Sequence, residues 1–328
     1  MKRFMFMVKP LCGFIIFLLF IISCGKQDIQ IPRFEKLPEF VSDHQIKLGS
    51  EILKPVRIQY LKDTLFVSYV KKPKIDIFNT KLEQIGTIDL SDPTPIFPTA
   101  FNVTDSFIYV TDHAKHVIVT FDRQGNYISS FGTLPDGITE LAPFSLFYFG
   151  GVLYVSDSKQ KGVLAISVVD AEGITEKGEL ILSIPADTLQ KIDFPSALYV
   201  TEDGRMIIGD ASSGSVHAYT CNGHFIYHFD TIPNMLKVAP QAIAQDNIID
   251  PSLQDTTKFD PSYINFQGRF HVVDPNNSAI HMYNPKGYYV ATYTDSLLVK
   301  PSGIAIDMDR FNIYIADPVA MKIFKFRY

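Results

Sequence analysis

Short apolar runs separated by turn-forming residues fill the stretch from 97 to 132. Four runs rich in β-branched and aromatic residues, which favour strands, occupy positions 100–103, 107–111, 117–121 and 127–131. Thr104-Asp105-Ser106 and the segment 122–125 supply turn residues between them. The pattern predicts a four-stranded meander. One sheet this small cannot bury both of its faces, so further copies must pack against it.

Two markers recur along the chain and divide it into six such units. A proline opens each unit: Pro55, Pro98, Pro143, Pro195, Pro261 and Pro301. An aspartate ends the second strand in five of them: Asp112, Asp157, Asp210, Asp274 and Asp317. Tyr69 stands at this place in the first unit. The two markers lie thirteen to sixteen residues apart, whereas successive prolines are 40 to 66 apart. The strands therefore keep their length while the connections vary, as in repeat proteins.

Six four-stranded sheets with a period of roughly 40–50 residues predict an all-β protein, a six-bladed β-propeller. A closed ring of sheets buries both faces of every sheet and leaves only short edges. The sixth unit ends after its third strand, at Tyr328, and the alternating segment 44–49 precedes the first complete unit. We expect this N-terminal segment to be the missing fourth strand of the last blade. The propeller would then span residues 44–328 as one domain.

The N-terminus has the pattern of a lipoprotein signal peptide. Lys2, Arg3 and Lys9 accompany an apolar run that is too short to span a bilayer comfortably. The segment Ile21-Ile22-Ser23-Cys24 resembles the lipobox of bacterial lipoproteins. An ordinary signal peptide or an N-terminal membrane helix is the alternative. We expect residues 1–23 to be removed and Cys24 to carry the lipid. The polar segment 24–43 would tether the propeller to the cell envelope, on the periplasmic side or at the cell surface.

Charge and cysteine content narrow the partners. Removal of residues 1–23 takes away three of the 30 Lys and Arg residues and none of the 35 Asp and Glu residues, which leaves a net charge of about −8. A protein that binds nucleic acid would need the opposite sign, so we expect no nucleic-acid partner. Cys221 would be the one cysteine without a lipid in the mature chain, which excludes an intramolecular disulfide.

The largest departure from the repeat is the connection 231–260 between the fourth and fifth units. Connections of this length are uncommon unless they are functional or disordered. A link between blades lies on the same side of a propeller as the turns that carry the aspartates. That face is therefore the expected binding surface, although an insertion without function is an equal alternative.

The aspartate markers are expected to be structural. One residue type at one place in five units fits a turn cap that accepts backbone N–H bonds better than five chemical sites. His113 and His116 share a turn without a cluster of further ligands, so we expect no metal and no cofactor. No HExxH, GxSxG, phosphate-binding or GxGxxG motif occurs.

The expected innermost strands line the central channel. They read PVRIQY, PTAFNV, PFSLFY, PSALYV, PSYINF and PSGIAI. Their one charged side chain is Arg57, and amides follow at Gln59, Asn102 and Asn265. A hard cation needs several oxygen ligands, usually with carboxylates among them, so this channel is poorly suited to a metal. Arg57, Asn102 and Asn265 are the candidate binding residues at the channel mouth.

The proline starts, the strand ends YVTD, YVSD, IIGD, HVVD and YIAD, and the hairpins with an aromatic, Asp or Asn, and glycine resemble NHL-type six-bladed propellers. More narrowly, the chain is similar to the propeller lipoproteins common in Bacteroidota. This resemblance implies a lipoprotein that binds other proteins or glycans, with no catalytic residues to carry over. Some related propellers are hydrolases or lyases. That alternative would place the site on the loop-rich face, with acids such as Asp136, Asp187 or Asp255.

Overall fold

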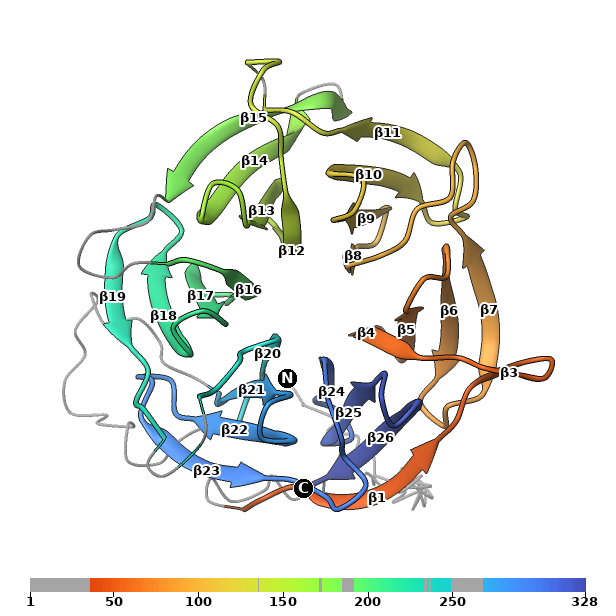
Figure 1. Ribbon diagram of the computed structural model, residues 1–328, viewed down its shortest axis with the longest axis vertical. Coiled ribbons are helices and arrows are strands. Elements are labelled where there is room, and N and C mark those ends of the chain that lie inside the picture. Colours follow the sequence, from red (N-terminus) through yellow and green to blue (C-terminus); the bar gives the residue numbers. More distant parts are fainter. Residues whose placement is uncertain are drawn as a thin grey trace, which may run out of the picture. The chain divides into compact units, whose positions relative to one another are not determined.

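The protein folds into a ring of six sheets, each with four strands (Figure 1). The computed structural model describes residues 36–134, 136–170, 173–184, 192–232, 235, 237–248 and 268–328. The expected six-bladed propeller is confirmed. Within the described ranges, no helix has the length and apolarity that a membrane crossing requires.

Each blade is an antiparallel meander whose first strand lies nearest the centre of the ring. The first blade consists of β4 (Pro55–Leu61), β5 (Thr64–Tyr69), β6 (Lys74–Asn79) and β7 (Gln84–Asp89). The second consists of β8 (Ala100–Val103), β9 (Phe107–Asp112), β10 (Val117–Asp122) and β11 (Tyr127–Phe131). The third consists of β12 (Pro143–Phe149), β13 (Val152–Asp157), β14 (Gly162–Asp170) and β15 (Gly173–Ile184). The fourth blade consists of β16 (Pro195–Val200), β17 (Arg205–Asp210), β18 (Ser215–Thr220) and β19 (Phe225–His228). The fifth consists of β20 (Ala242–Gln245), β21 (Phe270–Asp274), β22 (Ala279–Tyr283) and β23 (Tyr289–Tyr293). The sixth consists of β24 (Gly303–Asp307), β25 (Asn312–Asp317), β26 (Lys322–Arg327) and β1 (Glu39–His44).

The apolar core lies between neighbouring blades. Alternate side chains of a strand point to opposite faces of its sheet, so each blade contributes to two interfaces. Six clusters of buried apolar side chains result, one for every pair of adjacent blades. The cluster between the last and first blades contains Tyr314 and Ile323 from one and Leu65 and Phe78 from the other. The ring is therefore closed by the same kind of packing that joins its other blades.

An N-terminal strand completes the last blade, as expected, but it lies five residues earlier than the sequence pattern placed it. β1 pairs antiparallel with β26, from Glu39 opposite Arg327 to His44 opposite Ile323. The expected segment 44–49 mostly lies outside that strand, and Lys47–Leu48 instead pairs with Glu51–Ile52 in a small hairpin. Residues 39–43, expected as the end of the tether, thus belong to the propeller. In this register Phe40 lies opposite Phe326, and its ring packs against the rings of Phe324 and Phe326.

The fifth blade differs most from the expected arrangement. Its first strand is β20, preceded by Pro240, and not the segment opened by Pro261. The long connection therefore runs from 246 to 269, between the first and second strands, and not from 231 to 260 between two blades. Pro261 resembles the proline of a unit start because it lies thirteen residues before Asp274, one residue short of the 14 to 16 that separate the markers in the other units.

The long connection joins the first and second strands of its blade, which places it on the other face of the ring from the one expected. We call the side that carries the turns after Asp112, Asp157, Asp210, Asp274 and Asp317 the aspartate face. In an antiparallel meander the links between first and second strands lie on the opposite face. The expectation that the long connection shares a face with the aspartates is therefore wrong. The shorter link 229–241 does lie on the aspartate face.

Candidate functional site

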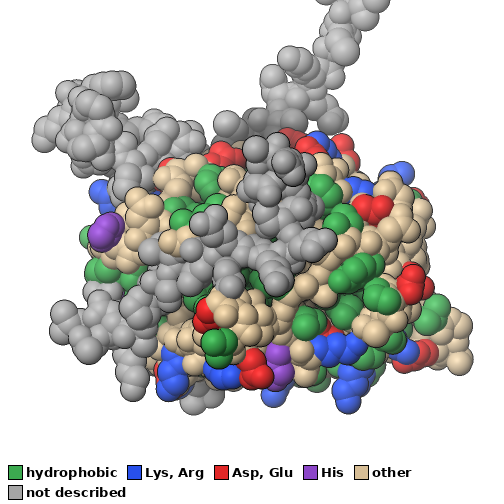
Figure 2. Space-filling view, turned by 90° about the horizontal axis from the view of Figure 1, so that it is seen from above, with side chains coloured by type: hydrophobic (Ala, Val, Ile, Leu, Met, Phe, Trp, Pro, Cys, Tyr) green, Lys and Arg blue, Asp and Glu red, His purple; other side chains and the backbone are tan. Residues whose placement is uncertain are grey.

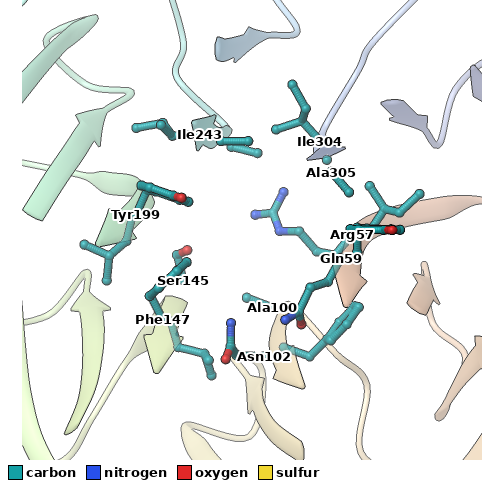
Figure 3. A pocket seen from close by; sticks show the side chains of 18 of the residues that line it. Arg57, Gln59, Ala100, Asn102, Ser145, Phe147, Tyr199, Ile243, Ile304 and Ala305 are labelled. Carbon is teal, nitrogen blue, oxygen red and sulfur yellow. The ribbon is translucent and has the colours of Figure 1, made fainter. Parts of the chain in front are cut away.

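A cavity of about 260 Å³ occupies the centre of the ring, lined by the innermost strands β4, β8, β12, β16, β20 and β24 (Figure 3). One residue of each innermost strand pairs with the residue just before the second marker of its blade, so these six residues are level with one another. They are Arg57, Ala100, Ser145, Ala197, Ala242 and Gly303. Arg57 is the one long side chain at this level, and the small residues Ala100, Ser145, Ala242 and Gly303 line the cavity with it.

Arg57 extends into the middle of the channel (Figure 3). It is 9% exposed, and its guanidinium donates a hydrogen bond to the backbone carbonyl of Ser302 on the last blade. Among the described residues that line the cavity there is no carboxylate and no histidine. Burial without an acidic partner in the cavity wall lowers the pKa of Arg57 to about 10. The guanidinium therefore remains positively charged at neutral pH. No described residue of the cavity lining carries a negative charge that could pair with it.

Polar and aromatic side chains surround the guanidinium. Asn102 and Ser145, 9% and 8% exposed, direct polar atoms toward the same space, and the hydroxyl of Tyr199 faces it from the other side (Figure 3). Burial raises the pKa of Tyr199, so its hydroxyl keeps its proton. The rings of Phe147 and Tyr199 pack edge to face with centroids 4.9 Å apart. The described lining thus offers one cation and an aromatic wall, together with the amides of Gln59, Asn102, Gln241 and Gln245 and the hydroxyls of Tyr60, Ser145 and Tyr199.

Gln59 lies next to this group but is already engaged. Its amide nitrogen donates to the carbonyl of Val103 at 2.9 Å, and its amide oxygen accepts from the Val103 N–H at 2.7 Å. The side chain thereby extends the hydrogen bonding of β4 onto β8. Its role is to join two blades.

The structure brings two of the three candidate channel residues together. Arg57 and Asn102 share the cavity, whereas Asn265 lies outside the described residues, and β20 rather than 261–266 is the innermost strand of its blade. Sequence reasoning did not select Ser145, Phe147 or Tyr199. Their register on the innermost strands was the available signal, since they occupy the third and fifth positions, as Arg57 and Gln59 do.

The acids considered for a catalytic alternative are distributed differently. Asp136 lies on the link before β12, where its carboxylate accepts hydrogen bonds from the hydroxyl and N–H of Thr139 and the N–H of Ile138, and these bonds lower its pKa. Asp187 and Asp255 lie outside the described residues, as does Cys24 with the expected signal and tether up to residue 35. Among the described residues, no group of three or more His, Cys, Asp or Glu side chains could hold a metal ion.

The marker aspartates bind backbone. Asp317 accepts N–H bonds from Val319 and Ala320 at 2.9 and 2.8 Å through one oxygen, and from Val299 and Lys300 at 2.7 and 2.8 Å through the other. The same two-sided arrangement recurs at Asp112, Asp157, Asp210 and Asp274. Each carboxylate caps its own turn and holds the chain that enters the blade. These are the contacts of a structural turn residue.

A buried charged cluster fastens the base of the long connection. Asp246 accepts hydrogen bonds from Arg269 Nε at 2.8 Å and from the Tyr328 hydroxyl at 3.1 Å, and His271 Nε2 lies 3.1 Å away. Burial alone would raise the pKa of Asp246, but the hydrogen bonds and charges of His271 and Arg269 bring it below the ordinary value. Gly268 has φ +77°, and a Cβ there would lie 1.8 Å from the Asp246 carbonyl oxygen, so only glycine fits. The cluster joins both ends of this connection to the C-terminal residue.

Comparison with known proteins places the chain by its fold. No family model matches it, and no curated protein matches it. Among solved structures, a streptogramin B lyase superposes with a TM-score of 0.59 at 14% identity, over 87% of this chain and 97% of that one. A catalytically inactive histidine-to-alanine variant of virginiamycin B lyase from Staphylococcus aureus, with quinupristin, gives 0.58 at 14% identity, over 88% and 100%. Selenomethionine-substituted virginiamycin B lyase from the same organism gives 0.58 at 15%, over 88% and 100%. Likeness at such low identity shows the shared propeller fold alone.

Proposed function

We propose that this protein is a lipid-anchored propeller of the bacterial cell envelope that binds a protein or glycan partner and does not catalyse a reaction. The observation that carries the proposal is the composition of the channel cavity. In the part of the chain that the structure describes, its lining combines one guanidinium with amide, hydroxyl and aromatic groups and includes no carboxylate or histidine. Such a site can hold a ligand by charge and hydrogen bonds, but its lining supplies no general base of ordinary pKa.

The second candidate is a lyase, which the structural neighbours favour. Virginiamycin B lyase is catalytically inactive when one of its histidines is replaced by alanine, so that enzyme depends on a histidine. No described residue of the cavity lining is a histidine, and the carboxylates of the five marker aspartates are engaged by backbone N–H groups. These two observations favour the binding function.

The position of β1 supports an orientation for the anchored protein. Glu39 pairs with Arg327, at the end of β26 away from the Asp317 turn, so the chain enters the ring on the face opposite the aspartates. A tether from Cys24 to residue 38 spans at most about 50 Å when fully extended. Lipid on Cys24 would therefore hold the entry face toward the membrane and present the aspartate face to partners. Basic and acidic side chains lie interspersed on the side seen in Figure 2, which supports a partner other than nucleic acid.

Two measurements on the full chain test this function. The Cys24→Ala variant should leave the membrane fraction, whereas the Cys221→Ala variant should remain in it and resist extraction with salt. The purified protein, incubated with quinupristin, should leave the mass of quinupristin unchanged in mass spectrometry. Membrane retention of the Cys24→Ala variant would contradict the anchor. Conversion of quinupristin would establish the lyase alternative.

A further inference from the structure

We propose that the channel cavity binds one acidic sugar unit, with the ligand carboxylate paired to Arg57. This inference rests on the proposed binding function and names the ligand class of the same cavity. Nothing in the likeness to solved structures assigns a ligand to this site. It follows from the charge, the space and the chemistry of the wall.

The charge of the cavity calls for an anion. A buried ionised group without a partner is costly, and proteins usually pair such groups. Arg57 is more than nine-tenths buried, and the described residues of the cavity wall supply the Ser302 carbonyl but no carboxylate. A planar guanidinium matches a carboxylate through two parallel N–H···O bonds. A carboxylate on the ligand would supply the negative charge that the described cavity lining does not provide for Arg57.

The small residues at the level of Arg57 leave room for that anion. Ala100 and Ser145 line the cavity near the guanidinium, where larger side chains would narrow the channel (Figure 3). The cavity of about 260 Å³ is slightly below the usual range of about 300–1,000 Å³ for sites that hold drug-sized ligands. The space therefore suits a single sugar ring rather than an extended chain.

The remaining lining favours a sugar over a simple carboxylic acid. Asn102 can both donate and accept hydrogen bonds, and Ser145 and Tyr199 add hydroxyls, which together complement the hydroxyl groups of a sugar. Phe147 and Tyr199 provide an aromatic wall for its apolar C–H face. Phosphate is a poorer fit, because one guanidinium faces the cavity, whereas phosphate sites usually gather several cationic or backbone N–H donors.

Isothermal titration of the full chain with D-glucuronate and D-galacturonate tests the proposal, with glucose, galactose and inorganic phosphate as the other probes. Arg57→Gln should weaken uronate binding at least tenfold, because it removes a charge-assisted pair. Arg57→Lys should weaken it to a smaller extent, because it keeps the charge without the fork of donors. The matched control is Arg123→Gln. Arg123 also donates to a backbone carbonyl, that of Thr104 at 3.2 Å, but does not line the cavity, so binding should be unchanged.

Thermal unfolding separates loss of binding from loss of folding. Uronate should raise the melting temperature of the parent protein and of the Arg123→Gln variant but not that of Arg57→Gln, whose own melting temperature should not fall below that of the parent. Equal binding of neutral and acidic sugars, an unaltered affinity in Arg57→Gln, or a stronger response to phosphate would each overturn the acidic-sugar assignment. The same applies if neither uronate binds. In these cases the binding function stands, whereas chemical conversion of a bound uronate would overturn the function itself.

Discussion

Two buried basic side chains show how position changes the chemistry of a residue. Arg57 lies in the channel, whereas His217 lies on β18 opposite His228 of β19. The Nδ1 of His217 is 2.9 Å from Nδ1 of His228, and its Nε2 is 2.7 Å from the Ser215 hydroxyl. Burial, and then the neighbouring His228, lower the pKa of His217 to about 4, while Asp210 acts in the opposite direction. The folded protein therefore keeps this imidazole neutral in mild acid.

Acid should destabilise the protein through His217. An unfolded chain binds a proton at this histidine below a pH of about 6.5, whereas the folded protein does so only near 4, so stability falls as pH falls between these values. The full contribution is about 3 kcal/mol. Chemical denaturation at pH 7 and pH 4.5 should show a smaller loss of unfolding free energy in His217→Leu than in the parent. Replacement of the exposed His224 should leave the loss unchanged, and a His217→Leu variant with the parental loss would contradict the assignment.

At the scale of the element, one aspartate ties two connections together in each of five blades. Because the carboxylate accepts N–H bonds from its own turn and from the incoming chain, it fixes both the bend and the start of the innermost strand. Asp317 is fully buried in this role. In the first blade Tyr69 occupies the same place, and its buried hydroxyl lies near the carboxylate of Asp76. Blade geometry therefore tolerates the loss of one cap when an apolar ring fills the space.

The cap at Asp317 should contribute strongly to stability. Asp317→Ala leaves four backbone N–H groups without their acceptor and should lower the unfolding free energy by about 3 kcal/mol. Urea denaturation measures the effect. The control is Asp309→Ala, an exposed position in another turn of the same blade, which should change stability by less than about 0.5 kcal/mol. Similar losses in the two variants would argue against the cap.

The sequence predicts the strands well and their order less securely. Alternation and turn residues place β8 and β11 at the observed bounds, and the marker spacing finds the first four blades. The fifth blade is misassigned because Pro261 nearly reproduces the spacing by coincidence, and only pairing across the sheet shows that β20 is the innermost strand. Arg57 and Asn102 can be selected as channel residues from their strands. Ser145 and Tyr199 can be assigned to the cavity only after the pairing of each blade shows which residues of the six innermost strands lie at the same level.

For the whole molecule, stability depends on closure of the ring. The six core clusters lie between blades, so a missing or incomplete blade exposes two interfaces. β1 covers the outer edge of β26, and Phe40 packs on the rings of Phe324 and Phe326. Without β1, that edge would expose unpaired backbone groups and favour association between chains.

Truncation distinguishes the contribution of β1 from that of the segment before it. A chain that begins at residue 36 should melt at the same temperature as the chain that begins at Cys24. A chain that begins at residue 45 should melt at least about 10 °C lower, because it loses the pairing with β26 and the cover of two aromatic rings. Differential scanning calorimetry provides the comparison. Equal melting temperatures for the two truncated chains would contradict closure by β1.

The pairing of β1 with β26 also determines how the protein responds to mechanical load. A pull on the N-terminal segment reaches Glu39 first, at the end of the register opposite Arg327. When the pull acts across the strands, it separates the residue pairs of β1 and β26 one after another toward His44. Peeling of this kind breaks bonds successively, whereas shear would have to break them together. The sixth blade would therefore yield before the other five, and the force at which it opens would limit the tension that the molecule withstands when it is held by its N-terminal segment.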